Sequence, residues 1–314
     1  MGGFLAFLLS CTKPPVEEPP EPSLSFEFNY HVEFNESGHI QAWIPLPENT
    51  RQQTLSTMSI DTDLNMYTAK DGLYGNTFVV VDDQVMAPQS IDISYTVTRR
   101  EATPYYDDSS QLQMALYQAE TSLVPRDVRF DKINASLEGE GAEFGHHLYS
   151  YVLEHMSYDK SGEGWGNGDA IFACDIGKGN CTDFHSLFNA VARSRSVPAR
   201  FKIGFPIPPE KEGEVNGYHC WTEFYCDEKG WVPVDISEAD KHPEKTDYYF
   251  GHLDERRLEL TTGRDIPLPN GRPEDVVNYS VYPYMKLDGI PSSAFTMAFS
   301  YREVEIPYNN VLEE

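Results

Sequence analysis

A glycine-rich turn that leads into a helix constrains this chain more than any other stretch. Residues 177–185 read GKGNCTDFH. The apolar residues that follow recur at helical spacing, at Phe184, Leu187, Phe188 and Val191. We therefore expect a helix from about Cys181 until Val197-Pro198 ends it. Asn180 is a good N-cap for this helix, and Asp183 stands at the capping-box position.

This helix start favours a reactive thiol. Cys181 would stand on the first turn, at the positive end of the helix dipole, where the thiolate is favoured over the thiol. With a cationic neighbour, such a placement can lower a cysteine pKa from about 8.5 to roughly 3.5–7.5. Free cysteines are nevertheless often buried for packing alone. Further residues must therefore support a catalytic role.

A predicted β-hairpin downstream carries a histidine and an aspartate. Its first strand follows Gly217 as YHCWTEFY, a polar turn DEKG follows, and the second strand reads WVPVDI. A thiol nucleophile needs a base to take its proton and an acceptor to fix the tautomer of that base. Cys181, His219 and Asp235 supply these three chemical types.

The register of this hairpin is not fixed by the sequence. A symmetric turn over residues 227–230 would set Asp235 opposite Thr222, and not beside His219. A turn centred earlier, near Asp227, or a bulge in the first strand would move Asp235 toward His219. We therefore expect a slip in register.

Four blocks of sequence resemble the core of the transglutaminase-like superfamily, which shares a papain-like fold. In chain order they read GNCTDFHSLF, VPARF, GYHCWTEFY and GWVPVDIS, and the resemblance extends from about Phe144 to Asp240. It implies that Cys181 is the nucleophile and His219 the general base and acid. Asp235 would then be the residue that orients His219.

Two tryptophans are candidate oxyanion or substrate contacts. In eukaryotic members of the superfamily, a tryptophan upstream of the cysteine helps to stabilise the oxyanion, and Trp165 precedes Cys181 here. Trp221 stands two residues after His219. A more general donor is the backbone N–H of Cys181. The second donor is left unassigned.

Three other interpretations concern the same residues. His185 is an alternative base because it lies one helical turn after Cys181, but it has no identifiable acid to orient it. A zinc site of Cys181, His185, His219 and Asp235 lacks the paired spacing of zinc motifs, so we expect no metal and no cofactor. Strand alternation places Cys220 on the face away from His219, which predicts a position in the core.

Charge limits the partners of this chain. Its 24 Lys and Arg residues face 50 Asp and Glu residues, a net charge of −26. Such a surface repels nucleic acid and anionic membranes. We therefore expect no nucleic-acid partner. A peptide or protein substrate, drawn from the cell envelope, is what the resemblance to the transglutaminase-like superfamily implies. The sequence contains no run of 18 apolar residues, the length that a membrane-spanning helix requires.

The N-terminus predicts a location. The sequence LLSC, which ends at Cys11, resembles a bacterial lipoprotein cleavage box, in which the cysteine is lipidated. This predicts a lipid-anchored periplasmic protein of the bacterial envelope, with the anchor as its only membrane contact. The residue after Cys11 is Thr12, whereas an aspartate at this position is associated with inner-membrane retention. In a Gram-negative host we therefore expect the outer membrane. The alternative is an ordinary frayed terminus.

Patterning divides the chain into four segments. Residues 1–23 hold the signal, the lipobox and a tether rich in Pro and Glu. Alternating apolar residues from Leu24 onward predict strands over 24–100, an N-terminal β module. Residues 101–141 form a connecting segment, and 142–314 form the transglutaminase-like catalytic domain with a C-terminal β extension. The expected fold class is α+β, a papain-like transglutaminase core preceded by a small antiparallel, sandwich-like β module.

Three functions are compatible with this organisation. We expect thiol-dependent hydrolysis of a peptide or carboxamide bond, the reaction of a peptidase or amidase. One alternative is a protein-glutamine acyl transferase that cross-links proteins, and another is a non-catalytic envelope binding or scaffold protein of the same fold. The loop from Pro206 to Gly217 suggests an open site, which favours hydrolysis. So does the lack of a recognisable calcium motif of the kind that controls many cross-linking transglutaminases.

Overall fold

The computed structural model describes residues 19–305. Cys11 and its cleavage box therefore lie outside the described residues, and lipid anchoring stays a prediction. Within residues 19–305, no helix is long and apolar enough to cross a membrane.

The described chain combines helices with antiparallel sheets, which confirms the α+β class. The helices are α1 (Gln111–Gln118), α2 (Val128–Ser136), α3 (Gly141–His155), α4 (Ala170–Ile176), α5 (Cys181–Ser194), α6 (Ile236–Lys241) and the 3₁₀ turn η1 (Pro243–Lys245). The first strands are β1 (Leu24–Phe34), β2 (Gly38–Leu46), β3 (Gln53–Asp61), β4 (Met66–Lys70), β5 (Thr77–Val85) and β6 (Gln89–Arg99). The central strands are β7 (Ser157–Tyr158), β8 (Lys178–Gly179), β9 (Ala199–Pro206), β10 (Glu212–Glu214), β11 (His219–Cys226), β12 (Gly230–Val234) and β13 (Arg257–Thr262). The last are β14 (Ile266–Pro267), β15 (Val276–Val277), β16 (Tyr284–Leu287), β17 (Ile290–Ser292) and β18 (Phe295–Glu303).

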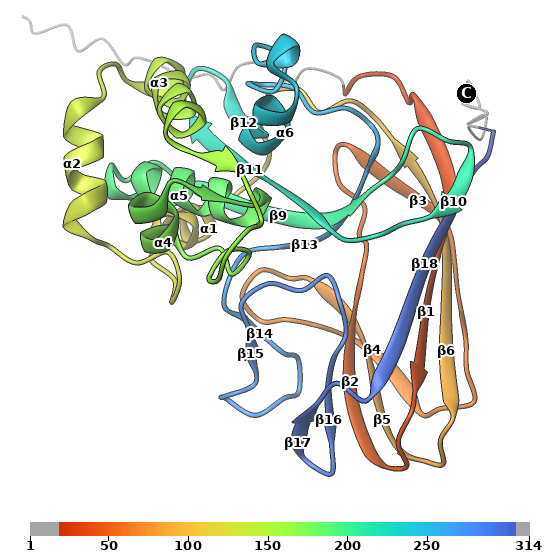
Figure 1. Cartoon of the computed structure of the whole chain (residues 1–314). Coiled ribbons are helices and arrows are strands. Elements are labelled where there is room, and N and C mark those ends of the chain that lie inside the picture. Colours follow the sequence, from red (N-terminus) through yellow and green to blue (C-terminus); the bar gives the residue numbers. More distant parts are fainter. Residues whose placement is uncertain (1–18, 306–314) are drawn as a thin grey trace, which may run out of the picture.

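Two five-stranded sheets form a β-sandwich, at the right and bottom of Figure 1. Their strand orders are β10-β18-β1-β6-β3 and β17-β16-β2-β5-β4. The alternation in β1 predicts a half-buried strand, and its apolar residues Phe26, Phe28 and Tyr30 are indeed buried between the sheets.

Both ends of the chain contribute to this sandwich. β18 pairs antiparallel with β1 from Phe26↔Glu303 to Phe34↔Phe295, and β16 pairs with β2. The division of the chain into segments stays a prediction. The strand pairing adds that strands after residue 283 complete the sheets that residues 24–99 begin.

The second part of the fold is a four-stranded antiparallel sheet, in the order β12-β11-β9-β13, with helices packed against it. Figure 1 shows these helices gathered at the upper left. The predicted helix after the glycine turn is present as α5, which ends at Ser194, shortly before Pro198. Its side chains are buried from Cys181 to Arg193, because α5 lies between the sheet and helices α2, α3 and α4.

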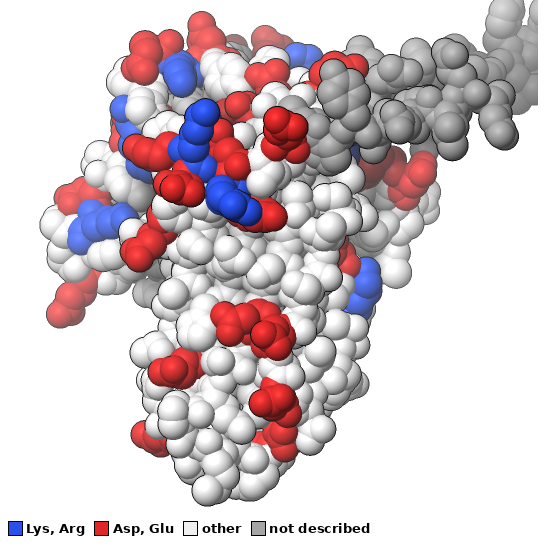
Figure 2. Space-filling model, turned by 90° about the vertical axis from the view of Figure 1, so that its right-hand side faces the viewer, with Lys and Arg blue, Asp and Glu red and all other residues white. Residues whose placement is uncertain are grey.

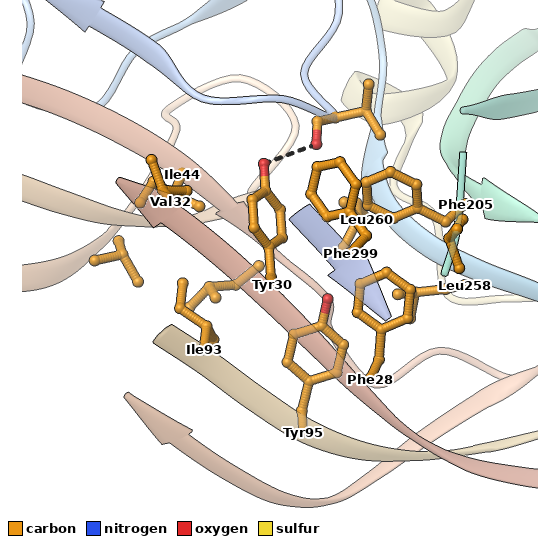
Figure 3. Packing of buried hydrophobic residues seen from close by; sticks show 14 of the residues in the cluster. Phe28, Tyr30, Val32, Ile44, Ile93, Tyr95, Phe205, Leu258, Leu260 and Phe299 are labelled. Carbon is orange, nitrogen blue, oxygen red and sulfur yellow. Dashed lines mark hydrogen bonds between the residues drawn. The ribbon is translucent and has the colours of Figure 1, made fainter. Parts of the chain in front are cut away.

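An aromatic cluster joins the two parts (Figure 3). β9 places Phe205 inside the sandwich, where its ring centroid lies 5.2 Å from that of Phe28 and 4.5 Å from that of Phe299. Leu258 and Leu260 of β13 belong to the same cluster. The core sheet and the sandwich therefore share one hydrophobic core.

The contact between the two parts also positions residues 279–282, which lie near the Cys181 thiol. The Tyr30 hydroxyl donates a hydrogen bond to the Val281 carbonyl at 3.1 Å, drawn as the dashed line in Figure 3. Val281 lies between Tyr279 and Tyr282, and the charge of a Cys181 thiolate acts on both of these phenols. The sandwich thus positions part of the wall around Cys181.

Acidic side chains are spread over the face of the molecule shown in Figure 2, from the helical part at the top to the sandwich at the bottom. Lysine and arginine side chains gather mainly toward the top of this view. This distribution follows from the net charge of −26. The expectation that nucleic acid is no partner stays a prediction.

Candidate active site

The start of α5 holds Cys181 in the way that the sequence predicts. The Asn180 side chain accepts a hydrogen bond from Thr182 N–H at 2.9 Å, and the Asp183 carboxylate accepts one from Asn180 N–H, also at 2.9 Å. The expected capping box is therefore confirmed. Cys181 is the first residue of the helix, where unpaired N–H groups favour negative charge.

Asp183 also ties a glycine-rich loop to this helix start. Its carboxylate accepts hydrogen bonds from Gly166 N–H at 2.7 Å and from Gly168 N–H at 3.0 Å. Gly179 makes room for the carboxylate, because a Cβ at this position would lie 2.3 Å from an Asp183 oxygen. Gly179 therefore serves close packing around this buried carboxylate.

The β11–β12 hairpin contains the expected slip in register. Its loop spans only residues 227–229, one residue fewer than the symmetric turn. The last pair of the hairpin is Thr222↔Val234. Continued by one position, this register sets Asp235 opposite Trp221 and not opposite Thr222. Because a one-residue slip exchanges the faces of a strand, Asp235 comes to the face that carries His219, as its diagonal neighbour.

Asp235 has a different partner set on each of its two oxygens. Oδ2 lies 2.6 Å from His219 Nε2 and 2.5 Å from Arg257 Nη1. Oδ1 accepts from Glu238 N–H and from the Ser237 hydroxyl, each at 3.0 Å, so it caps α6. Burial alone would raise the pKa of Asp235, but His219 and Arg257 hold it well below the ordinary value. The carboxylate is therefore charged and fixed.

His219 bridges this carboxylate to the thiol. Because its Nε2 faces Asp235, Nδ1 is the nitrogen that remains for Cys181, and it also lies 4.0 Å from Glu238 Oε1. Burial alone would lower the pKa of His219, but the charge and hydrogen bond of Asp235 raise it to about 9. His219 therefore tends to carry a proton on both ring nitrogens at neutral pH.

The pKa of the Cys181 thiol is shifted in the opposite direction to that of His219. Burial alone would raise the pKa of Cys181, but the neighbouring Cys220 and His219 side chains and the charge of His219 hold it well below the ordinary value. The two shifts together favour a thiolate beside an imidazolium at neutral pH. This arrangement can attack an electrophilic carbon and then return a proton.

His185 lies in the same region but differs from His219. Its side chain is fully buried, and burial lowers its pKa to about 4 against the charge of Asp235. Its Nε2 accepts a hydrogen bond from Ile236 N–H at 3.2 Å, and its Nδ1 lies 3.5 Å from Cys220 Sγ. His185 is therefore neutral at pH 7. Cys220, predicted to be core, is fully buried as well.

The two candidate tryptophans occupy different environments. Trp165 is half-buried, and its indole N–H donates to the Gly162 carbonyl of its own loop at 3.2 Å. Trp221 is buried between the His219 ring, at a centroid distance of 6.4 Å, and the Arg257 guanidinium, 5.6 Å from the indole centroid. Contacts of either tryptophan with an oxyanion or substrate stay predictions.

Tyrosines surround the thiol. Burial raises the pKa of Tyr218, which also forms a hydroxyl chain: Asn180 Nδ2 donates to Tyr218 at 3.0 Å, and the Tyr218 and Tyr279 oxygens lie 3.3 Å apart. Only 2% of Cys181 and 6% of His219 are exposed. The site is thus closed, and a substrate must displace a covering side chain.

Sequence reasoning missed one residue of the site. Arg257 is more than 20 residues from Asp235 and belongs to β13, so no local pattern indicates their pairing.

No metal centre is found in residues 19–305, where no group of three or more His, Cys, Asp or Glu side chains could hold an ion. The four cysteines of this range, Cys174, Cys181, Cys220 and Cys226, are free thiols.

The sheet and the helix together bring a thiol, an imidazole and a carboxylate into one buried region of an α+β protein. Residues 131–236 match the family model of the transglutaminase-like superfamily, and this range contains Cys181, His219 and Asp235. The chain therefore contains a transglutaminase-like core, which confirms the resemblance seen in the sequence.

Several known proteins are similar to this chain. An uncharacterised protein of Haemophilus influenzae is 25% identical, with 82% of this chain and 83% of that protein covered. The uncharacterised protein YebA of Bacillus subtilis is 28% identical over 127 residues, 37% of this chain but 16% of YebA. Among solved structures, a provisionally described cysteine protease from Cytophaga hutchinsonii aligns with a TM-score of 0.60 at 12% identity. It covers 91% of this chain and 92% of its own, which shows that the fold is shared over nearly the whole length.

Proposed function

We propose that this chain is a cysteine-dependent amide hydrolase, a peptidase or amidase, in which Cys181 is the nucleophile. One observation carries the proposal. His219 holds the pKa of the Cys181 thiol low, and its Nε2 lies 2.6 Å from the buried Asp235 carboxylate. A thiol, a base and an acid in this order are the parts that nucleophilic acyl transfer requires.

Acylation begins with the thiolate. Cys181 Sγ attacks the carbonyl carbon of the amide, and the carbonyl oxygen gains the negative charge. The backbone N–H of Cys181, at the start of α5, is one donor suited to this oxyanion. The C–N bond then breaks, and His219 gives its Nδ1 proton to the leaving amine. The acyl group remains on Cys181 as a thioester.

Deacylation reverses the proton transfer. Neutral His219 takes a proton from water, and the hydroxide attacks the thioester carbon. The C–S bond breaks, the carboxylic acid leaves, and the thiolate and imidazolium are restored. Asp235 keeps its charge throughout and holds Nε2–H of His219, so that Nδ1 stays directed at the reaction.

A cavity close to the base suits a peptide substrate. It has a volume of about 240 Å³ and begins at Gly217, two residues before His219. Its lining combines polar residues, Glu214 and Asn216, with apolar ones, Val215, Tyr282, Met297 and Phe299. Such a cavity could hold a side chain of a peptide whose scissile bond lies at Cys181.

The loop before His219 is more ordered than its composition suggests. Its residues 212–214 form β10 on the edge of the sandwich, and Val215 N–H donates to the Phe299 carbonyl. The expectation of an open loop is therefore no support for hydrolysis. The preference for water over an amine rests instead on the sequence argument that no calcium motif is recognisable.

Product analysis tests the proposal. The protein would be incubated with a peptide library, with and without a primary amine, and the products read by mass. We expect hydrolysed peptides that disappear in Cys181→Ala and persist in Cys174→Ala, a free thiol outside the site. Amine adducts without hydrolysis would identify a cross-linking transferase. If no Cys181-dependent product formed, the non-catalytic binding protein would become the better interpretation.

A further inference from the structure

We propose that Glu238 positions the water molecule that hydrolyses the Cys181 thioester, by holding that water against Nδ1 of His219. This inference rests on the proposed function, because it concerns one step of that reaction, deacylation. It assigns a role to a partly buried carboxylate beside the base that the mechanism above does not use.

His219 lies between two carboxylates, one at each ring nitrogen. Asp235 Oδ2 lies 2.6 Å from Nε2, and Glu238 Oε1 lies 4.0 Å from Nδ1. Both carboxylates belong to the start of α6, because Asp235 is its N-cap and accepts a hydrogen bond from Glu238 N–H at 3.0 Å. The residue that orients the base therefore also fixes the backbone of Glu238.

The distance between Glu238 and the base suits a bridging water. At 4.0 Å, Oε1 is too far from Nδ1 for a direct hydrogen bond, which is usually about 2.7–3.2 Å long. A water at about 2.8 Å from both atoms would span this distance. Such a water can donate one hydrogen to Nδ1 of neutral His219 and the other to Glu238, because both atoms are acceptors.

The two sides of the His219 ring differ in exposure. The Asp235 side chain is 0% exposed, whereas the Glu238 side chain keeps 20% of its surface exposed. Water can therefore reach the ring from the Glu238 side. Because Nδ1 is also the nitrogen that remains for Cys181, a water held at Nδ1 is placed next to the sulfur that carries the acyl group.

The other partners of Glu238 are compatible with this role. Lys241 Nζ lies 2.7 Å from Oε1, and His242 Nε2 lies 3.7 Å from Oε2. A carboxylate oxygen can accept more than one hydrogen bond, so Oε1 can bind Lys241 and a water together. The ammonium of Lys241 also favours the charged form of Glu238, which must remain an acceptor.

The proposed step uses only the groups already named. Water gives one hydrogen to Nδ1 of His219, its oxygen bonds to the thioester carbon, and the C–S bond breaks to release the Cys181 thiolate. The second hydrogen, directed at Glu238 during the attack, stays on the carboxylic acid product. Glu238 keeps its charge, and its contribution is to orient the oxygen lone pair of the water toward the carbon.

An activated ester separates the two half-reactions. p-Nitrophenyl acetate would be added at neutral pH to the full-length protein, Glu238→Ala, Glu238→Gln and Glu244→Gln. The initial burst of nitrophenolate reports acetylation of Cys181, and the slower steady release reports deacetylation. Peptide mass spectrometry would show that Cys181 carries the acetyl group. Glu244 is the matched control, because it is an exposed carboxylate that pairs with His242.

Deacetylation should fall on the order of 10- to 100-fold in Glu238→Ala, because a hydrogen bond to a charged group is lost. Acetylation should stay nearly unchanged, so that acetylated protein accumulates. Glu238→Gln keeps a neutral acceptor and should lie between Ala and the unmodified protein. Hydroxylamine, a stronger nucleophile than water, should restore release of the acetyl group in Glu238→Ala. Glu244→Gln should match the unmodified protein.

Unchanged deacetylation in Glu238→Ala would show that the water needs no help from Glu238. An equal fall of acetylation and deacetylation would show a general disturbance of His219. Either result overturns this inference alone, provided that the unmodified protein forms acetyl-Cys181. If the unmodified protein forms none, the proposed function fails, and this inference fails with it. Should Glu238→Ala unfold at a lower urea concentration, the isosteric Glu238→Gln decides the question.

Discussion

Arg257 and His219 share one oxygen of Asp235: Arg257 Nη1 lies 2.5 Å and His219 Nε2 2.6 Å from Oδ2. The carboxylate thus compensates two buried cationic groups, and Arg257 has a second partner in Asp254, at 3.1 Å. The two cations also oppose each other. Arg257 lowers the pKa of His219, while Asp235 raises it more strongly.

Asp235→Asn should impair catalysis while α6 keeps its N-cap; loss of the ion pair with Arg257 lowers the stability of the Asn and Ala variants alike. Asn is as good an N-cap as Asp, so α6 should persist. Without the carboxylate, the pKa of His219 should fall from about 9, and the imidazolium beside Cys181 should be lost. We expect turnover to drop on the order of 10³-fold with little change in KM. Asp235→Ala, which also removes the cap, should unfold at a clearly lower urea concentration than Asp235→Asn. Equal kinetics in Asp235→Asn and wild type would refute the orienting role of Asp235.

Arg257→Met should move the alkaline limb of the activity profile upward. Removal of this cation leaves His219 as the main partner of Asp235, so the pKa of His219 should rise further above 9. Loss of one partner from a buried ion pair should also cost about 3 kcal/mol of unfolding free energy. The readouts are a pH profile of kcat/KM and urea unfolding. Arg256→Met is the neighbouring control, because Arg256 pairs with Glu303 away from the site.

Turnover should follow a bell-shaped pH profile. The acid limb reflects protonation of Cys181, whose lowered pKa places it well below pH 8.5. The pKa of His219 is raised, so the imidazolium is present at neutral pH and is lost as the pH rises through about 9. Turnover should therefore fall above about pH 9. Alkylation of Cys181 needs only the thiolate and should not fall there, and a parallel decline of both rates would contradict this assignment.

Asp183→Ala should loosen the glycine loop ahead of the thiol. Its carboxylate satisfies three backbone N–H groups, those of Gly166, Gly168 and Asn180, and their loss should cost about 3 kcal/mol. Urea unfolding would measure the cost. Hydrogen exchange should become faster in peptides that cover residues 164–169. Asp175→Ala, which removes a surface ion pair with Arg129, is the control and should leave both measurements unchanged.

Phe205→Ala should test the shared core of the two parts. Its ring packs between Phe28 and Phe299 inside the sandwich, and its removal should cost on the order of 4 kcal/mol. If the parts unfold as one unit, fluorescence and circular dichroism should report the same lowered midpoint. Two separate transitions would mean that the sandwich and the core sheet are stable independently.

Local sequence patterns are sufficient to predict the local parts of the site. The spacing of apolar residues and the capping residues Asn180 and Asp183 define α5, because a helix start depends on residues within one turn of each other. The alternation over Leu24–Phe34 likewise defines β1. The chemical types at Cys181 and His219 were visible for the same reason, since each stands at a recognisable point of its own element.

Contacts between segments that are far apart in the chain determine which elements meet. β18 alternates as a strand should, yet nothing in its residues states that it pairs with β1 at the other end of the chain. A one-residue difference in the β11–β12 loop decided the face on which Asp235 lies. The contact of Asp235 with Arg257 arises from packing between separate elements. Periodicity records the environment of each residue within its own element, whereas partners are chosen by long-range packing, which a local pattern does not encode.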